Sequence, residues 1–290
     1  MEGSIENLVE QYGEGAISRR SFIQKGAILL GSTAAATTLV ESLRFNPAVA
    51  AVVEPDDPNL ISSAVEYPGD GFTMHGYLSR PKAAGKRGGL IVIHENRGIN
   101  DHIRDVARRA AKEGMAALAP DLLSRAGGTD KFTNPDDAIA AINKLTSTDL
   151  IKDLQSSFTY LKGLDTVIPG KIGVIGFCWG GANSLLFSTQ NRELAATVVF
   201  YGRNPNPIDL VRNLPGPILG IYGERDTGIT SKVPELEEAL KKYNKLYEIK
   251  IYPGAQHAFH NETNPSRYNP EAARDAWARA MVFLKKNLQS

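Results

Sequence analysis

Cysteine is almost absent from this chain of 290 residues, and its single occurrence, Cys178, excludes an intramolecular disulfide. The five histidines form no cluster with it at the spacing of a zinc site. The glycine-rich signatures of dinucleotide-binding and P-loop proteins are missing too. The sequence therefore predicts no metal ion and no other cofactor.

Excess charge of one sign is also lacking. The whole chain has a net charge of +1, and residues 51–290 hold 29 Lys and Arg against 27 Asp and Glu. This near-balance gives no electrostatic basis for binding nucleic acid or an anionic membrane. We expect neither as a partner.

No apolar run is long enough for a comfortable transmembrane helix, but the N-terminus resembles a twin-arginine export leader. Residues 17–25 contain the pair Arg19 and Arg20, residues 26–40 are modestly apolar, and residues 48–50 read A-V-A. A basic pair, a short apolar run and a small-residue cleavage site together form a signal peptide. We predict that the twin-arginine machinery exports the folded precursor to the periplasm or beyond. Residues 1–50 are then removed, which leaves no stable membrane association.

Two alternatives remain for this segment. It is an ordinary amphipathic helix of a cytoplasmic protein, or it is an uncleaved anchor. Without it, about 240 residues are left, which suits one α/β domain. Residues 51–60 contain two prolines and two aspartates and are predicted to be a linker, and residues 61–290 are predicted to be the domain.

Apolar strands alternate with helical segments through most of this domain. Residues 61–67 and 72–79 are predicted to form an antiparallel hairpin around P-G-D-G. The alternation after it predicts a doubly wound, mostly parallel sheet with helices on both faces. The expected strands are 90–94, 115–119, 171–176, 195–201, 217–222 and 246–252. The expected helices are 101–113, 135–145, 149–163, 180–190, 231–243 and 270–287.

Residues 176–181 read G-F-C-W-G-G and lie between a predicted strand and a predicted helix. This is the G-x-S-x-G nucleophile elbow with Cys178 in place of serine. The glycines allow the nucleophile's neighbours to approach the adjacent strand and helix closely. A free cysteine is often a small buried hydrophobe. Here the downstream acid and histidine favour a nucleophile.

The candidate acid and base follow later strands, in the chain order of an α/β-hydrolase triad. Asp226 comes shortly after the strand 217–222, and Glu224 in the same loop is its competitor. His257 lies on the loop after the strand 246–252, and His260 is the alternative. A histidine that accepts the thiol proton generates the nucleophilic thiolate, and a carboxylate holds the imidazole in place.

The elbow also predicts an oxyanion hole. The backbone N–H of Trp179 lies at a helix N-terminus, where the local dipole favours negative charge. A second donor is expected from the loop after an earlier strand, and the N–H of Asn96 after the strand 90–94 is our candidate.

Together these segments resemble the dienelactone hydrolase (carboxymethylenebutenolidase) family over residues 60–290. The resemblance implies an α/β-hydrolase fold and a triad of Cys178, His257 and Asp226. It also implies that Glu95 contacts the resting thiol and moves when substrate binds. The motifs are H-E-N-R-G at 94–98, A-P-D-L-L-S-R at 119–125, G-F-C-W-G-G at 176–181, Y-G-E-R-D at 222–226 and G-A-Q-H-A-F at 254–259.

Substrate recognition is where the chain departs from that pattern. The resemblance implies that Arg125 holds a substrate carboxylate, but the second arginine of the family is replaced by Asn261. A neutral amide binds a carboxylate less strongly than an arginine fork does. Arg97 is a possible substitute or a structural residue. Phe259, with Phe177 and Trp179, is a candidate for an apolar substrate pocket or for core packing.

The function predicted from the sequence is hydrolysis of a lactone or carboxylic ester through an acyl-cysteine intermediate. A general carboxylesterase or thioesterase with the same triad is the main alternative. A non-catalytic exported binding protein on the same fold is a further one.

Overall fold

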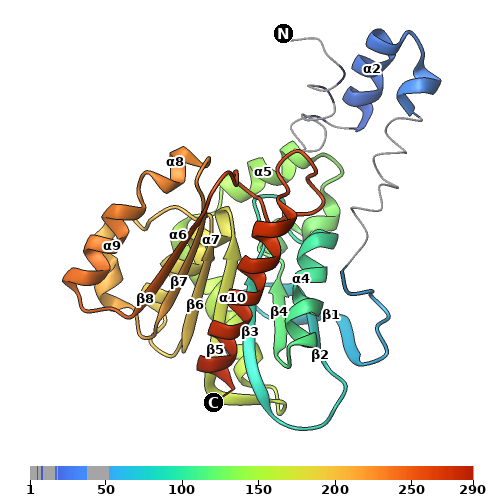
Figure 1. The fold of residues 1–290 in the computed structure, drawn as a ribbon. Coiled ribbons are helices and arrows are strands. Elements are labelled where there is room, and N and C mark those ends of the chain that lie inside the picture. The colour runs from blue at the N-terminus through green and yellow to red at the C-terminus, as the bar shows by residue number, and fades with distance from the viewer. Residues whose placement is uncertain (1–4, 6–7, 9–16, 18, 38–51, 290) are drawn as a thin grey trace.

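The computed structural model describes residues 5, 8, 17, 19–37 and 52–289. Its centre is an eight-stranded sheet in the order β1-β2-β4-β3-β5-β6-β7-β8 (Figure 1). β1 pairs antiparallel with β2 and β2 with β4, and all other pairs are parallel. The strands are β1 (Leu60–Pro68), β2 (Thr73–Pro81), β3 (Arg87–Ile93), β4 (Ala116–Pro120), β5 (Val167–Phe177), β6 (Ala196–Phe200), β7 (Ile218–Gly223) and β8 (Tyr247–Tyr252).

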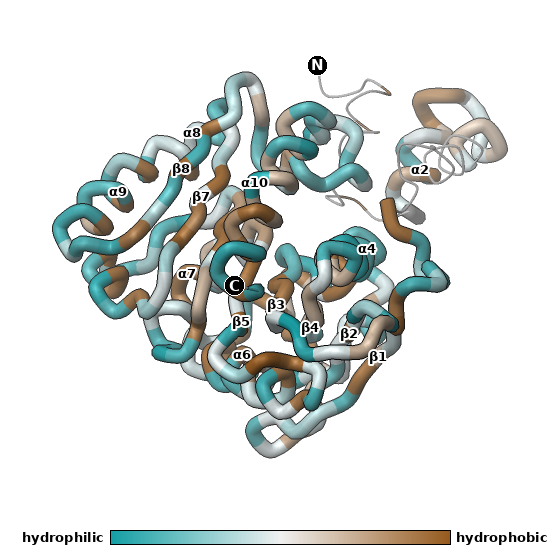
Figure 2. Tube along the Cα trace, turned by 60° about the horizontal axis from the view of Figure 1, so that its bottom comes forward, coloured by the Kyte–Doolittle hydropathy of each residue, from teal (hydrophilic) through white to brown (hydrophobic). Residues whose placement is uncertain are grey.

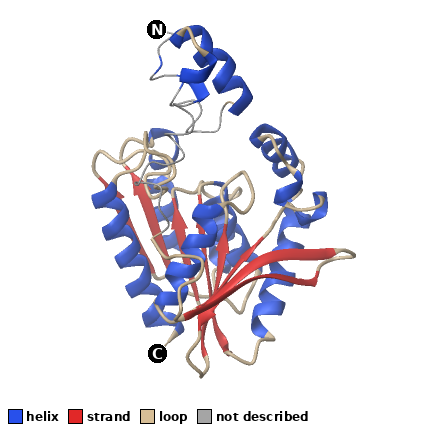
Figure 3. Ribbon diagram, turned by 90° about the vertical axis from the view of Figure 1, so that its right-hand side faces the viewer, coloured by secondary structure: helices blue, strands red, loops and turns tan. Residues whose placement is uncertain are grey.

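Helices follow most of the parallel strands and cover both faces of the sheet (Figure 3). The predicted α/β fold, with an N-terminal antiparallel hairpin and a mostly parallel sheet, is confirmed. Beyond the prediction, β5 begins at Val167 and a short helix α8 follows β7. The main helices are α4 (Asp101–Lys112), α5 (Pro135–Asn143), α6 (Ser147–Lys162), α7 (Trp179–Gln190), α8 (Thr227–Thr230), α9 (Val233–Lys242) and α10 (Pro270–Leu288).

Strand β3 ends in a continuous apolar run, residues 90–93, and its surroundings explain this run. All seven of its residues are buried, because helices cover the sheet on both sides. Leu90 and Val92 belong to the cluster that includes α4 and α10, whereas Ile91 and Ile93 belong to the cluster that includes α6. Successive side chains of a strand point to opposite faces, so a continuous apolar run fills both layers of the core. Figure 2 shows that the central strands are hydrophobic, whereas helix α9 at the outside is mainly hydrophilic.

The helix α2 (Arg19–Leu30) contains the twin-arginine pair. Phe22 packs with Leu8 in a small apolar cluster of their own, separate from the clusters of the sheet. Within the described part of the chain, no helix is both long and apolar enough to cross a membrane. The predicted cleavage site at residues 48–50 lies outside the described residues.

The segment 52–59, predicted to be part of a linker, contains no helix or strand. It is nevertheless attached to the domain, because the Asp105 carboxylate accepts hydrogen bonds from the N–H groups of Val52 (3.0 Å) and Val53 (2.8 Å). Val53 is buried against the domain.

Candidate active site

Cys178 lies at the turn between β5 and α7, at the carboxyl edge of the sheet. Its backbone has φ of 55° and ψ of −115°, a region that residues with side chains rarely adopt. The N–H of Cys178 donates to the carbonyl of Phe200, at the end of β6, over 3.1 Å. The neighbouring strand thus holds the strained turn, and the thiol remains partly exposed.

Gly176 and Gly180 make this turn possible. A Cβ on Gly176 would lie 2.0 Å from the Gly180 carbonyl oxygen, and one on Gly180 would lie 2.4 Å from the carbonyl oxygens of Ile93 and His94. Backbone atoms cannot yield at such distances, so any side chain would displace α7 from β3 and β5. The glycines therefore bring the start of α7 against the end of β3.

His257 and Asp226 meet beside this turn. The His257 Nδ1–H donates to Asp226 Oδ2 over 2.6 Å, from the loop after β8 to the loop after β7. The two alternatives are engaged elsewhere. Glu224 accepts a hydrogen bond from the N–H of Gly254, and His260 is fully buried in the aromatic core beside Phe177. The structure thus pairs Asp226, rather than Glu224, with the predicted base.

The protonation of His257 reflects both of its neighbours. Burial alone would lower the pKa of the imidazole, but hydrogen bonds to Asp226 and Cys178, and the charges of these two groups, raise it to about 10. At neutral pH the His257 imidazole is therefore protonated, and it lies beside the Cys178 side chain. A cation at this position favours the anionic form of a neighbouring group.

The two predicted oxyanion donors lie on neighbouring elements. Trp179 is the first residue of α7, so its N–H has no partner within the helix. Asn96 lies three residues after β3, whose last residue, Ile93, is in register with Gly176. Between them, the ring of His94 stacks on Trp179 with centroids 5.7 Å apart.

Sequence reasoning did not assign a role to His94. Its Nδ1–H donates to the Glu95 carbonyl over 2.6 Å, and its Nε2 accepts from the N–H of Leu122 over 3.2 Å. Burial lowers its pKa, which keeps the ring neutral and able to accept. His94 thereby fixes the start of the loop that carries Glu95 and Asn96. Its position directly after a strand was the feature of the sequence that could have indicated this role.

Glu95 is held by Asn261, the residue at the position of the missing arginine. Asn261 Nδ2–H donates to Glu95 Oε2 over 2.8 Å. The other end of the amide is fixed, since Asn261 Oδ1 accepts from the N–H (3.0 Å) and the hydroxyl (2.6 Å) of Thr263. In this structure the Asn261 amide therefore binds a carboxylate of the protein itself.

Tyr201 is a second residue that sequence reasoning missed. It follows β6, has φ of 40°, and its ring lies 5.2 Å from that of His257 in an edge arrangement. Burial, followed by the charges of Glu95, Cys178, Glu262 and Asp226, raises the pKa of its hydroxyl. Three of these four residues, and the His257 ring that Tyr201 contacts, are candidate site residues, so Tyr201 lies among them.

Arg125 departs from the expectation that it holds a substrate carboxylate. Its guanidinium contacts the buried Asp153 through two nitrogens, Nε to Oδ2 and NH2 to Oδ1, each over 2.9 Å. Asp149 and Asp70 lie 3.7 and 3.9 Å away, and the Phe72 ring lies 4.6 Å below the guanidinium. A substrate carboxylate would meet three acidic side chains there, so this structure gives Arg125 a role in holding α6.

Phe259 and Arg97 complete the predicted set. Phe259 is fully buried and packs against Tyr201 and Tyr252, which corresponds to the core-packing alternative for this residue. The aromatic side chain fills the core beneath the histidine loop instead. Arg97 is partly buried on the same loop as Glu95 and Asn96.

A cavity of about 460 Å³ lies between the β1–β2 pair and the loop after β4. Its lining includes His75, Tyr77, Arg104 and Asp130. Among the described residues, those that line this cavity do not include Cys178, His257 or Asp226. The chemistry of the site therefore gives a better guide to function than this cavity does.

Comparison with known proteins identifies the family of this chain. The model of the dienelactone hydrolase family matches residues 74–288. A protein of Methylorubrum extorquens named "Putative carboxymethylenebutenolidase" is 33% identical over 268 residues, which cover 88% of this chain and 92% of that protein. A protein of the same name from Saccharolobus solfataricus is 35% identical and covers 76% of this chain and 96% of its own length.

A solved structure shows the same relationship. The crystal structure of a "Putative Dienelactone Hydrolase" from Klebsiella pneumoniae has a TM-score of 0.73 and 30% sequence identity, and the match covers 78% of this chain and 99% of that one. The family match spans the strands and loops that carry Cys178, Asp226 and His257. The chain therefore belongs to the dienelactone hydrolase family.

Proposed function

We propose that this enzyme hydrolyses a lactone or a carboxylic ester, with Cys178 as the nucleophile, His257 as the acid and base, and Asp226 as the orienting carboxylate. The observation that carries the proposal is the position of His257, which hydrogen-bonds to Asp226 over 2.6 Å and lies close enough to Cys178 for that residue to raise the pKa of the imidazole. Three loops at one edge of the sheet supply the three groups.

Acylation begins from the thiolate and imidazolium. The Cys178 Sγ attacks the carbonyl carbon, and the N–H groups of Trp179 and Asn96 stabilise the oxyanion that forms. As the tetrahedral intermediate collapses, the imidazolium donates its proton to the leaving alkoxide oxygen. An ester releases an alcohol at this step, whereas a lactone opens to a hydroxyl that stays on the acyl chain.

Deacylation returns the enzyme to its starting state. Neutral His257 accepts a proton from water as the water oxygen attacks the thioester carbonyl. The carbon–sulfur bond then breaks, the thiolate leaves, and the imidazolium stabilises it again. Asp226 keeps its charge throughout and holds the ring in the tautomer that presents Nε2 to sulfur and substrate.

The arginine contacts indicate the substrate class. The Arg125 guanidinium is already paired with Asp153, and Asn261 has a neutral amide that is bonded to Glu95, so neither residue offers an unpaired positive charge to a substrate carboxylate. We therefore propose a neutral lactone or ester rather than an anionic one as the better substrate.

A substrate panel tests this proposal. We expect p-nitrophenyl acetate and an uncharged lactone to be hydrolysed with kcat/KM at least about tenfold above that of a carboxylate-bearing dienelactone, since an unpaired charge is costly to bind. Steady-state rates, with Cys178→Ala as the control, measure it. A strong Cys178-dependent preference for the anionic lactone would contradict the substrate assignment, and no turnover of any substrate would contradict hydrolysis.

Export of the precursor is a further part of the proposal. It rests on the twin arginines, the apolar run and the small residues at 48–50. We expect a shortened protein that begins near residue 51 in the periplasmic or secreted fraction, and a cytoplasmic, full-length protein after Arg19 and Arg20 are both replaced by lysine. Full-length wild-type protein confined to the cytoplasm would contradict export.

A further inference from the structure

Helix α4 carries charged residues into the interior beside the active site. His102, Asp105, Arg108 and Arg109 are all at most 8% exposed. Figure 2 shows α4 mainly in the hydrophilic colour, although nine of its residues are buried. Buried charges are stable only where partners compensate them. The partners of these side chains therefore identify the segments that α4 fixes in place.

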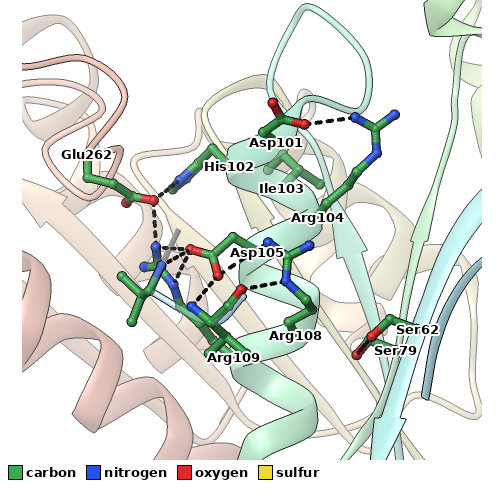
Figure 4. A network of polar contacts seen from close by, with 12 residues as sticks. Ser62, Ser79, Asp101, His102, Ile103, Arg104, Asp105, Arg108, Arg109 and Glu262 are labelled. Carbon is green, nitrogen blue, oxygen red and sulfur yellow. Dashed lines mark hydrogen bonds and ion pairs between the residues drawn. The ribbon is translucent and has the colours of Figure 1, made fainter. Parts of the chain in front are cut away.

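The first partner is Glu262, which lies five residues after His257 on the same segment (Figure 4). Its Oε1 accepts from His102 Nδ1 over 3.0 Å and from Arg109 NH2 over 2.5 Å. Burial would raise the pKa of Glu262, but the contact with His102 and the charge of Arg109 lower it to about 2. Glu262 is thus a fully ionised anchor between the histidine segment and α4.

The second partner is Asp105, on the other side of Arg109. Arg109 Nε–H donates to Asp105 Oδ2 over 2.9 Å, while the same carboxylate accepts the N–H groups of Val52 and Val53. Arg108 Nε–H donates to the Val53 carbonyl over 2.6 Å. One guanidinium, that of Arg109, therefore bridges two carboxylates, and α4 is fixed to the segment that follows the predicted leader.

The histidine segment needs such an anchor. Ala258, directly after His257, has φ of 61°, which is strained for a residue with a Cβ. The conformation persists only where the chain around it is held, and Glu262 is the ionic contact that joins this segment to α4. On the nucleophile side, the His102 ring packs edge-on against Phe177, the residue before Cys178, with centroids 6.1 Å apart. Helix α4 thus contacts both the base segment and the nucleophile strand.

We propose that Glu262, held by Arg109 and His102, is a positioning residue that keeps His257 against Cys178. The network from Asp105 through Arg109 to Glu262 fixes the segment on which His257 is carried, and the strained backbone at Ala258 transmits that position to the imidazole. The proposal rests on the proposed function, since it assigns Cys178 and His257 as the pair that must stay in contact.

The test uses Glu262→Gln in the full-length protein, with Glu193→Gln as the matched control. Glu193 forms an exposed ion pair with Lys162 over 2.5 Å, so its loss removes the same kind of charge away from the site. Iodoacetamide reports directly on Cys178, the single cysteine, and its rate follows the thiolate fraction. We expect Glu262→Gln to raise the pH midpoint of alkylation by about one unit and to lower kcat about 10- to 100-fold with little change in KM.

Arg109→Lys is the second variant, because it keeps the charge but loses the fork that bridges Asp105 and Glu262. It should shift the alkylation midpoint in the same direction by a smaller amount, and it decides the question if Glu262→Gln does not fold. A folded Glu262→Gln protein, or failing that a folded Arg109→Lys protein, with the wild-type midpoint and kcat would overturn the proposal. Alkylation needs no ester substrate, so the positioning role is judged even if the hydrolase assignment fails.

Discussion

Replacing Cys178 with alanine is expected to lower kcat/KM for a neutral ester by about 10³-fold or more, because no other group can form the acyl intermediate. Residual catalysis would come from the oxyanion donors and from binding alone. The measurement is steady-state hydrolysis of p-nitrophenyl acetate by purified wild-type and variant proteins. The thermal midpoint of the variant should remain close to that of the wild type, since alanine is smaller and the site is partly exposed.

Cys178→Ser is the natural companion variant. It keeps an oxygen nucleophile at the strained turn, but the serine hydroxyl does not form the anion that pairs with the imidazolium. We expect a rate between those of the wild type and the alanine variant. If Cys178→Ala retains a tenth or more of the wild-type turnover, Cys178 is not the nucleophile.

Asp226→Asn should produce the second large effect, a fall in kcat of about 10²- to 10⁴-fold. The amide no longer stabilises the imidazolium and favours the wrong tautomer of His257. The contact over 2.6 Å between these residues contributes to the raised pKa of about 10, so its loss must lower that pKa. In a pH–rate profile, the midpoint of the alkaline limb should lie at a lower pH in the variant than in the wild type.

Glu224→Gln is the matched control for that variant. Glu224 lies in the same loop, but its carboxylate accepts from the N–H of Gly254 and not from His257. We expect its kcat to stay within about threefold of the wild type, as for an exposed loop contact. Equal and small losses in both variants would remove Asp226 from the triad.

The fold was predictable because its signals are local. The alternation of apolar strands with helices, and the hairpin turn near Asp70, appear in short windows of sequence. The elbow was predictable for the same reason, since Gly176, Cys178 and Gly180 lie within five residues. The order of acid and histidine then placed Asp226 and His257 on loops that parallel strands bring to one edge.

The partners of the site residues were not predictable in this way. The contact of Arg125 with Asp153 depends on how α6 packs, and that of Asn261 with Glu95 joins residues 166 positions apart. No periodicity encodes such a pairing, and the resemblance to the family pointed Arg125 toward substrate instead. Phe259 shows the same limit, because an aromatic residue beside a catalytic histidine gives no indication of whether it faces the core or the pocket.

The most direct test is to trap the acyl-enzyme. The wild-type protein is incubated with a slowly deacylated activated ester, quenched in acid, digested and analysed by mass spectrometry. We expect an acyl group on the peptide that contains Cys178, sensitive to hydroxylamine as a thioester should be, and absent from Cys178→Ala. Turnover of the ester at the wild-type rate with the acyl group on another residue, or with none on Cys178 under single-turnover conditions, would contradict nucleophilic catalysis by this cysteine.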